Sequence, residues 1–327
     1  MSSQRAFGAP LGPGRATLVA IGNFDGVHRG HHAVLAQALA AARTEDVTPL
    51  VLTFEPHPAV VLRRGTMPAL TSFERKLELL CRQSPELGVV VEEFTPALAK
   101  TEPADFVAQL LVQKLAARLV LVGEDFRFGR GRAGDFELLE QLGQQHGFRA
   151  LAATLERDAQ GPISSTRIRG ALSDGDLSEV TRLLGRPHAL SGVVVPGQGR
   201  GRTIGVPTAN LDAIAEALPP HGVYAVLVDQ KHEDAQGSNH RVLGSGVANF
   251  GVRPTLGAGP SFEVHLLDFD RNLYGQSLRI HLVSRLREER KFAGVEELRA
   301  QIGRDMEAGR AIVAECKPDP SARGAWY

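Results

Sequence analysis

The residues best suited to chemistry lie in one short segment, Gly22-Asn23-Phe24-Asp25-Gly26-Val27-His28-Arg29-Gly30-His31. An apolar run over 17–21 predicts a buried strand before it, and an Ala/Leu-rich run over 32–43 predicts a helix after it. At a helix N-terminus, unpaired N–H groups and the helix dipole favour a phosphate. The imidazoles of His28 and His31 could donate hydrogen bonds to charge that grows there. We therefore expect phosphate chemistry at this segment; the alternative is a surface turn with two solvated histidines.

Three more segments of the first half carry polar groups after an expected strand or at a helix start. Thr53–Pro58 is a loop made rigid by two prolines, and in Val122–Gly129 we expect Asp125 and Arg127 to face a ligand. In Ile163-Ser164-Ser165-Thr166-Arg167-Ile168-Arg169, three hydroxyls and two arginines could bind a polyphosphate. A stiff connection and a Ser-capped helix with solvated arginines are the alternatives for the first and third segments.

The run Gly129-Arg130-Gly131-Arg132-Ala133-Gly134 matches the G-x-G-x-x-G pattern of dinucleotide-binding turns by letter. That pattern needs a tight turn from strand to helix, and the first glycine here lies too far beyond the expected strand. We interpret the match as accidental.

The second half of the chain has a glycine-rich cationic loop, Gly197-Gln198-Gly199-Arg200-Gly201-Arg202-Thr203-Ile204-Gly205, followed by Val206-Pro207-Thr208-Ala209-Asn210. The hydroxyl of Thr208 and the carbonyl of Asn210 are hard oxygen ligands that suit Mg²⁺ held jointly with phosphates. No Gly-Lys pair occurs, so this is not a P-loop, and a structural turn is the alternative. Further on, the run 262–267 alternates as a strand does, so we expect Glu263 to point to the face opposite its two neighbours. The usual interpretation of a single carboxylate on a strand is that it is solvated.

These segments fall into two regions of different pattern. Strand-like and helix-like runs alternate over the first 185 residues, which predicts a parallel sheet covered by helices. From 188 to 286, short β-branched runs separated by Gly and Pro predict a closed barrel or a sandwich. The apolar positions Val295, Leu298, Ile302 and Met306 predict a helix that packs on it, and residues 318–327 are expected to fray.

Composition narrows the class of protein. The chain has 327 residues, a length that is enough for two ordinary domains, and its hydrophobic content of 43% is enough to form their cores. Lys+Arg and Asp+Glu both number 37, and this balance disfavours a general nucleic-acid binder. Two cysteines, Cys81 and Cys316, have no metal-ligand spacing. With no secretory signal and no membrane-spanning run, we expect a soluble, cytoplasmic protein without disulfides.

Taken together, the motifs resemble those of bacterial bifunctional riboflavin kinase/FAD synthetases. Segment 22–31 is similar to the HxGH signature of nucleotidylyltransferases, 163–169 to an Ile-Ser-Ser-Thr-x-Ile-Arg signature, and 207–210 to the Pro-Thr-Ala-Asn motif of riboflavin kinase. The resemblance continues in order through 246–255, 263–269, Tyr274-Gly275 and 287–292, and covers about residues 17–312. It implies an α/β Rossmann-like nucleotidylyltransferase domain over 1–185. An antiparallel β-barrel riboflavin kinase domain with a C-terminal helix would occupy 186–327.

The resemblance also implies roles for individual residues. Glu263 would act as the base on the ribityl 5′-hydroxyl of riboflavin, and His28 and His31 would stabilise charge on the phosphates. Thr208 and Asn210 would hold Mg²⁺. Flavin contacts are implied for Asp125, Arg127, Asn249 and Arg253, and nucleotide or phosphate contacts for Gly22, Phe24, Asp25, Gly30, Ser164, Thr166, Arg167, Arg169, Gly199, Arg202 and Gly205. The chain departs from the family's usual residues at His188, Pro196 and Phe250.

The implied reactions use riboflavin and ATP to make FMN, and FMN with a second ATP to make FAD and pyrophosphate. No nucleic-acid or membrane partner is expected, and a homo-oligomer is one option. Two other hypotheses remain: a kinase whose first domain has lost adenylylation, and a flavin-binding sensor without turnover. The histidine segment argues against the first and Glu263 against the second, because a binder needs no base.

Overall fold

The computed structural model describes residues 4–8, 14–62, 67–197, 201, 204–234, 237–252, 260–319 and 325–327. By internal packing the chain divides into two compact units. The first contains Met1–Pro68 and Phe73–Ser165, and the second contains Ala69–Ser72 and Thr166–Tyr327. The domain boundary expected after residue 185 stays a prediction; residues 166–185 pack with the second unit.

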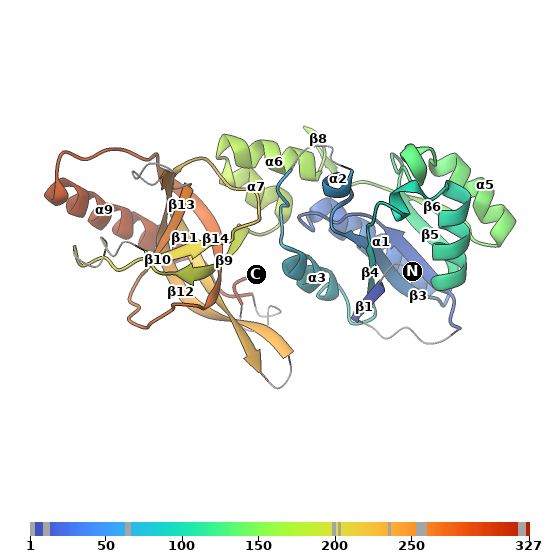
Figure 1. Ribbon diagram of the computed structural model, residues 1–327, viewed down its shortest axis with the longest axis horizontal. Coiled ribbons are helices and arrows are strands. Elements are labelled where there is room, and N and C mark those ends of the chain that lie inside the picture. The colour runs from blue at the N-terminus through green and yellow to red at the C-terminus, as the bar shows by residue number, and fades with distance from the viewer. Residues whose placement is uncertain are drawn as a thin grey trace. The chain divides into compact units, whose positions relative to one another are not determined.

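The first unit is built on a six-stranded sheet in the order β1-β4-β3-β2-β5-β6 (Figure 1). Strands β2 to β6 pair in parallel, as the alternating pattern predicts. The sequence pattern missed β1, which pairs antiparallel with β4. The strands are β1 (Gln4–Gly8), β2 (Thr17–Ile21), β3 (Thr48–Glu55), β4 (Gly88–Glu93), β5 (Ala117–Gly123) and β6 (Arg149–Ala153).

Helices cover both faces of this sheet. Alternate residues of a strand point to opposite faces, so Leu50 and Leu52 of β3 enter one apolar cluster and Val51 enters another. Helices α1 (Arg29–Thr44) and α3 (Phe73–Cys81) supply Leu35, Leu79 and Leu80 to the cluster around Val51. The π-helix η2 (Phe106–Lys114) and α5 (Phe136–His146) cover the other face. The shorter elements are α2 (Pro58–Val61), η1 (Leu98–Lys100), α4 (Pro103–Asp105), η3 (Arg130–Arg132), β7 (Arg157–Asp158) and β8 (Gly161–Pro162).

The second unit contains a closed antiparallel barrel, which settles the choice between barrel and sandwich (Figure 1). The strand order around it is β10-β13-β12-β11-β14-β9. Ala248, Phe262 and Val264 are among the alternating side chains that fill it. Two helices precede it, α6 (Ser165–Asp174) and α7 (Leu177–Leu184), the second ended by Gly185 at φ 76°. The strands are β9 (His188–Val195), β10 (Ala209–Asp212), β11 (Gly222–Asp234), β12 (Gly237–Val252), β13 (Pro260–Leu266) and β14 (Ser277–Arg287).

The predicted C-terminal helix is present as α9 (Val295–Val313) and packs against β11, β12 and β14. Its buried row is Asp305, Gly309 and Val313, whereas Val295 of the expected apolar stripe is 56% exposed. Gly309 allows this close packing, because a Cβ there would lie 2.9 Å from Cγ2 of Val247. The helix was predicted correctly, and Leu298, Ile302 and Met306 of the expected stripe are half-buried; the prediction is wrong for Val295.

The expectation that residues 318–327 fray is wrong for the described part of this tail. The side chain of Trp326 is buried, and its indole Nε1 donates to the Val228 carbonyl at 3.1 Å. Its backbone N–H donates to Oδ1 of Asp229 at 3.0 Å, and the N–H of Asp319 donates to the Trp326 carbonyl. The tail therefore forms part of the barrel's packing.

Candidate functional site

His28 and His31 lie in the first turn of α1 and hold each other in place. The N–H of His31 donates to Nδ1 of His28, and the N–H of His28 donates to Nδ1 of His31, both at 3.3 Å. The two rings stack with centroids 3.6 Å apart. This reciprocal arrangement is a capping box made of two imidazoles in place of the usual Ser/Thr and Glu. It uses Nδ1 of each ring.

Gly30 is required by this arrangement. A Cβ at Gly30 would lie 2.8 Å from the Ile163 carbonyl oxygen and 3.1 Å from the His28 ring. The turn before it contains two buried residues at positive φ, Phe24 at 50° and Val27 at 38°. A β-branched residue rarely adopts such a φ, and strained backbone of this kind concentrates at functional sites. The turn therefore carries strain beside the helix N-terminus.

The loops that follow three parallel strands line one cavity of about 400 Å³. Gly22 and Asn23 follow β2, His57 and Pro58 follow β3, and residues 125–129 follow β5. The order of the strands reverses between β2 and β5, and doubly wound sheets bind ligands at such a point. Asp125 and Arg127, which the sequence pattern places toward a ligand, both line the cavity. Its aromatic walls, Phe54, Phe94, Phe106, Phe126 and Phe128, suit a flat ring system.

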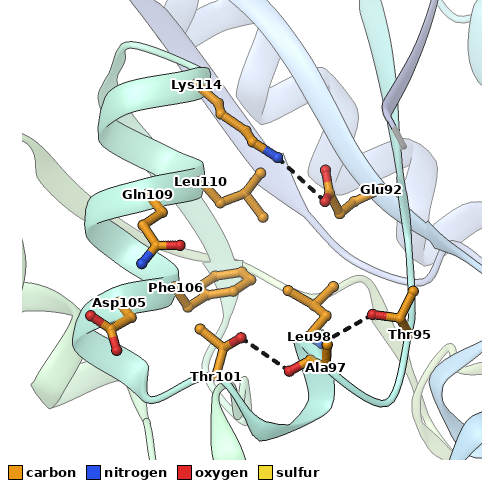
Figure 2. Close-up of a pocket in the computed structure, with 10 residues that line it drawn as sticks. All are labelled: Glu92, Thr95, Ala97, Leu98, Thr101, Asp105, Phe106, Gln109, Leu110 and Lys114. Atoms are coloured by element: carbon orange, nitrogen blue, oxygen red, sulfur yellow. Dashed lines mark hydrogen bonds and ion pairs between the residues drawn. The ribbon is translucent and has the colours of Figure 1, made fainter. Parts of the chain in front are cut away.

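A second cavity, of about 200 Å³, lies beside the first between β4 and η2, and the two share Leu98 and Phe106 as wall residues (Figure 2). Its polar lining includes the buried carboxylate of Glu92, which pairs with Nζ of Lys114 at 3.6 Å. Sequence reasoning identified neither residue.

Sequence reasoning also missed Lys76, whose ammonium group interacts with the carboxylate of Asp25 in the strained turn. Its side chain is almost fully buried, and Nζ donates to the Phe54 carbonyl at 3.2 Å. Burial lowers the pKa of Lys76, while the carboxylates of Glu55 and Asp25 act to raise it. The sequence contained a signal for this burial, because Lys76 lies on the same helix face as the apolar residues Leu79 and Leu80.

The hydroxyl and arginine segment begins α6, as predicted. Ser165 Oγ donates to the Asp25 carbonyl at 2.9 Å, which ties this helix start to the histidine turn. Arg167 pairs with Glu179 of α7 at 2.6 Å. Hydrogen bonds from Arg182 and then Arg167 lower the pKa of Glu179. Thr166, Arg167 and Arg169 belong to the second unit.

In the barrel, strand register places three predicted residues side by side. Glu263 of β13 is paired with Asn210 of β10 on one side and with Asn249 of β12 on the other. Cross-strand partners share one face of a sheet, so the three side chains form a row. Thr208 Oγ1 donates to Oε2 of Glu263 at 3.2 Å. Sequence positions 208, 210, 249 and 263 thus form one site.

The surroundings of this row explain several neighbours. A Cβ on Gly197 would overlap the side-chain amide of Asn210, so the glycine loop begins by packing directly on that residue. Gly205 has φ 80°, a conformation that favours glycine. His265, to which the sequence pattern gave no role, has Nδ1 2.7 Å from the Pro207 carbonyl and so fixes the Pro-Thr-Ala-Asn turn. Gly199, Arg202 and Arg253 lie outside the described residues.

A cavity of about 360 Å³ adjoins this row. Pro207 and Thr208 line it together with Phe269–Tyr274 and the barrel residues Val194, Val264 and Leu266. Two departures from the family pattern, His188 and Phe250, are buried elsewhere: His188 Nε2 lies 2.8 Å from the Ala217 carbonyl, and Phe250 packs on Phe262. These two residues are therefore part of the barrel's packing.

Within the described ranges, no three or more His, Cys, Asp or Glu side chains cluster as a metal site, and neither Cys81 nor Cys316 forms a disulfide. Among the described helices, none has the length and apolar content needed to cross a membrane.

Comparison with known proteins matches the two halves of the chain to two different families. A family model described as FAD synthetase matches residues 13–167, and one described as riboflavin kinase matches residues 184–313. The bifunctional riboflavin kinase/FMN adenylyltransferase of Escherichia coli (strain K12) is 40% identical over 94% of this chain and 96% of its own. That of Bacillus subtilis (strain 168) is 36% identical over 88% of this chain and 90% of its own.

A solved structure also matches over most of the chain. It is described as a macrolide-efflux protein from Streptococcus pneumoniae, with a TM-score of 0.77 and 30% sequence identity. The match covers 91% of this chain and 95% of that one. On the identity over most of the chain and the two family models, the chain belongs to the family of bifunctional riboflavin kinase/FMN adenylyltransferases.

Proposed function

We propose that the second unit phosphorylates riboflavin to FMN with ATP, and that the first unit adenylylates FMN to FAD with a second ATP and releases pyrophosphate. Family membership supports both reactions. The observation that carries the proposal is the row Asn210–Glu263–Asn249 with Thr208 bonded to Glu263. A flavin-binding protein without turnover would need no carboxylate at the centre of this row.

In the kinase step, Glu263 takes the proton from the ribityl 5′-hydroxyl. The oxygen attacks the γ-phosphorus of ATP, the bond from that phosphorus to the bridging oxygen breaks, and ADP leaves. Thr208 donates to Glu263 and so fixes which way the carboxylate points before the substrate arrives. Such catalysis rests mainly on positioning and electrostatics. Asn249 and Arg253 are the proposed flavin ligands, and Gly199, Arg202 and Gly205 the proposed phosphate ligands.

Thr208 and Asn210 offer the oxygen donors that Mg²⁺ prefers, and their place beside Glu263 supports this ion as a cofactor. Bound there with the phosphates of ATP, Mg²⁺ would offset the charge that develops during transfer. We propose this pair as the protein's share of the metal site.

In the adenylylation step, a phosphate oxygen of FMN attacks the α-phosphorus of ATP, and the bond to pyrophosphate breaks. A phosphate dianion needs no general base. The capping box occupies Nδ1 of His28 and His31, so each neutral ring carries its proton on Nε2 and presents that N–H as a donor. We assign these donors to the phosphates. Proposed nucleotide contacts are Gly22, Phe24, Asp25, Gly30, Ser164, Thr166, Arg167 and Arg169, with Asp125 and Arg127 on the flavin.

We further propose that the chain works in the cytoplasm on small-molecule substrates, without nucleic acid or membrane partners. The equal numbers of basic and acidic residues support the absence of a nucleic-acid partner. A homo-oligomer is compatible with the proposal.

The kinase assignment is tested with Glu263→Gln, which keeps the shape of the side chain and removes its basicity. Loss of a general base should slow FMN formation by about 100-fold or more. FMN supplied directly should still become FAD. Chromatography of riboflavin, FMN and FAD over time measures both; equal loss of both activities in a folded variant would contradict two separate sites.

The adenylylation assignment is tested with His28→Asn, because asparagine also caps a helix, while the Nε2 donor is lost together with the ring that stacks on His31. FAD formation should fall by about 100-fold, the usual cost of one lost donor to developing charge. FMN should accumulate from riboflavin at the native rate. His146→Asn, at an exposed position in the last turn of α5, is the matched control. Native FAD formation by His28→Asn would remove His28 from the chemistry.

A further inference from the structure

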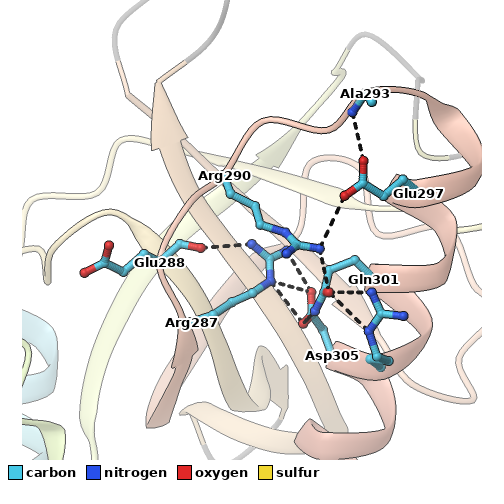
Figure 3. Close-up of polar contacts among 8 residues, drawn as sticks. Arg287, Glu288, Arg290, Ala293, Glu297, Gln301 and Asp305 are labelled. Atoms are coloured by element: carbon cyan, nitrogen blue, oxygen red, sulfur yellow. Dashed lines mark hydrogen bonds and ion pairs between the residues drawn. The ribbon is translucent and has the colours of Figure 1, made fainter.

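Three polar residues on one face of α9 hold the segment that links β14 to this helix (Figure 3). Glu297, Gln301 and Asp305 are spaced by four residues, so they form one row along the helix. Each one bonds to residues 287–293. The C-terminal helix therefore does more than cover the barrel.

Asp305 makes the strongest of these contacts. Its carboxylate receives hydrogen bonds from Arg287, from Nε at 3.0 Å and from Nη2 at 2.8 Å. Gln301 Nε2 donates to the other carboxylate oxygen at 2.7 Å, while its own oxygen accepts from Arg290 at 2.8 Å. The carboxylate of Asp305 is only 7% exposed. Two bonds from one guanidinium fix its direction as well as its distance.

The guanidinium of Arg287 in turn orders the segment. Its Nη1 donates to the Glu288 carbonyl at 2.9 Å, and its Cζ lies 5.6 Å from the centre of the Phe292 ring. Arg290 lies over the same ring at 4.8 Å. Residues 287–292 are thereby held together around one side chain that Asp305 orients.

This segment reaches the row that contains Glu263. A Cβ on Gly251 of β12 would overlap the carboxylate of Glu289. Gly251 is two residues from Asn249, so both face the same side of the strand, and Asn249 is the partner of Glu263. Val247, two residues the other way on that face, packs under Gly309 of α9. The helix and the segment thus border the site on its Asn249 side.

We infer that Asp305 is a positioning residue for the kinase reaction, which sets the place of segment 287–293 beside the flavin through Arg287. The inference rests on the proposed function, in which riboflavin lies on the Asn249 side of Glu263 and the nucleotide on the Thr208 side. Displacing the segment therefore weakens riboflavin binding and leaves ATP binding intact.

The test is Asp305→Asn in the full chain, assayed with riboflavin and ATP varied separately. The KM for riboflavin should rise about tenfold, while the KM for ATP stays within about twofold of native. Asp305→Glu keeps the charge and should recover part of the loss. Glu307→Gln removes a carboxylate from an exposed position two residues away and should match the native chain.

A second variant separates positioning from simple unfolding. Arg287→Lys keeps the charge, cannot make the two-bond contact, and should show the same rise in riboflavin KM. Because both changes break the contact between Asp305 and Arg287, the double variant should be no worse than the worse of the two single variants. The fluorescence of Trp326, whose side chain is buried in the second unit, reports the amount of folded barrel in each variant.

The outcomes separate the two hypotheses. A native chain that does not phosphorylate riboflavin would contradict the proposed function. A native chain that does so, with riboflavin KM unchanged in both variants or ATP KM raised equally, would overturn the role of Asp305 alone. If Asp305→Asn fails to fold, Arg287→Lys decides.

Discussion

At the scale of single residues, the first site depends on crowding that only a glycine permits. His28 can cap α1 and stack on His31 because nothing projects from position 30. The neighbouring carbonyl of Ile163 leaves no space for a methyl group there. The same closeness brings backbone N–H groups to the surface at which phosphate is expected.

Gly30→Ala should therefore lower FAD formation by about tenfold or more, since a displaced imidazole cannot meet the developing charge. FMN formation from riboflavin should remain at the native rate. The two rates are measured in one reaction by chromatography. Gly303→Ala is the matched control, because a Cβ there has nothing within 4 Å. A native FAD rate in Gly30→Ala would show that His28 does not need its observed position.

At the scale of elements, the C-terminal tail and the barrel share one buried charged cluster. Asp229 of β11 accepts from Arg279 at 2.8 Å, from the Trp326 N–H at 3.0 Å, and lies 2.7 Å from Nε2 of His281. Burial acts to raise the pKa of Asp229, but His281 and Arg279 outweigh it and hold the pKa at about 2. The tail is thus attached to the barrel through an ionised carboxylate.

Asp229→Asn should destabilise the barrel by about 3–5 kcal/mol near neutral pH, because it leaves the Arg279 charge buried without its partner. The native group has a pKa below its ordinary 3.8, so its stabilisation is complete above that pH and is lost as pH falls through about 2. The difference between native and variant should therefore shrink by about 2 kcal/mol from about pH 5 to about pH 2.

Urea unfolding followed by the fluorescence of Trp326, the one tryptophan in the sequence, measures both effects. Asp268→Asn breaks an exposed ion pair between Arg310 and the loop after β13, and should change stability little. A difference between Asp229→Asn and native that is constant with pH would contradict the ionised state of Asp229.

The same elements show how far sequence pattern goes. Alternation along 17–153 predicted the parallel strands, and short β-branched runs predicted the barrel strands, because both patterns follow from which side chains must be buried. The packing of the C-terminal tail was missed because a single tryptophan produces no periodic pattern. Strand β1 was missed because an edge strand is formed by pairing with the rest of the sheet, which its own sequence does not show. The site row was predicted as motifs, but only register brings Asn249, Asn210 and Glu263 together.

At the scale of the whole molecule, each unit has its own core, its own cavity and its own proposed catalytic groups. The clusters around Leu50 and Val51 lie wholly in the first unit, and the cluster that contains Ala225 and Trp326 lies wholly in the second. The role proposed for Glu263 in the kinase reaction does not depend on the histidine turn. We therefore expect the two reactions to be separable between different copies of the chain.

Mixing Glu263→Gln with His28→Asn should restore FAD synthesis from riboflavin, because the second variant releases FMN that the first can use. FAD should appear after a lag in which FMN accumulates, and the lag should shorten as Glu263→Gln is added in excess. Time courses at several ratios of the two variants measure this. If the mixture makes FMN without FAD, although Glu263→Gln alone converts added FMN, then FMN is not released during the reaction. FMN made by one chain would then be converted to FAD only by the same chain, or by the oligomer that contains it.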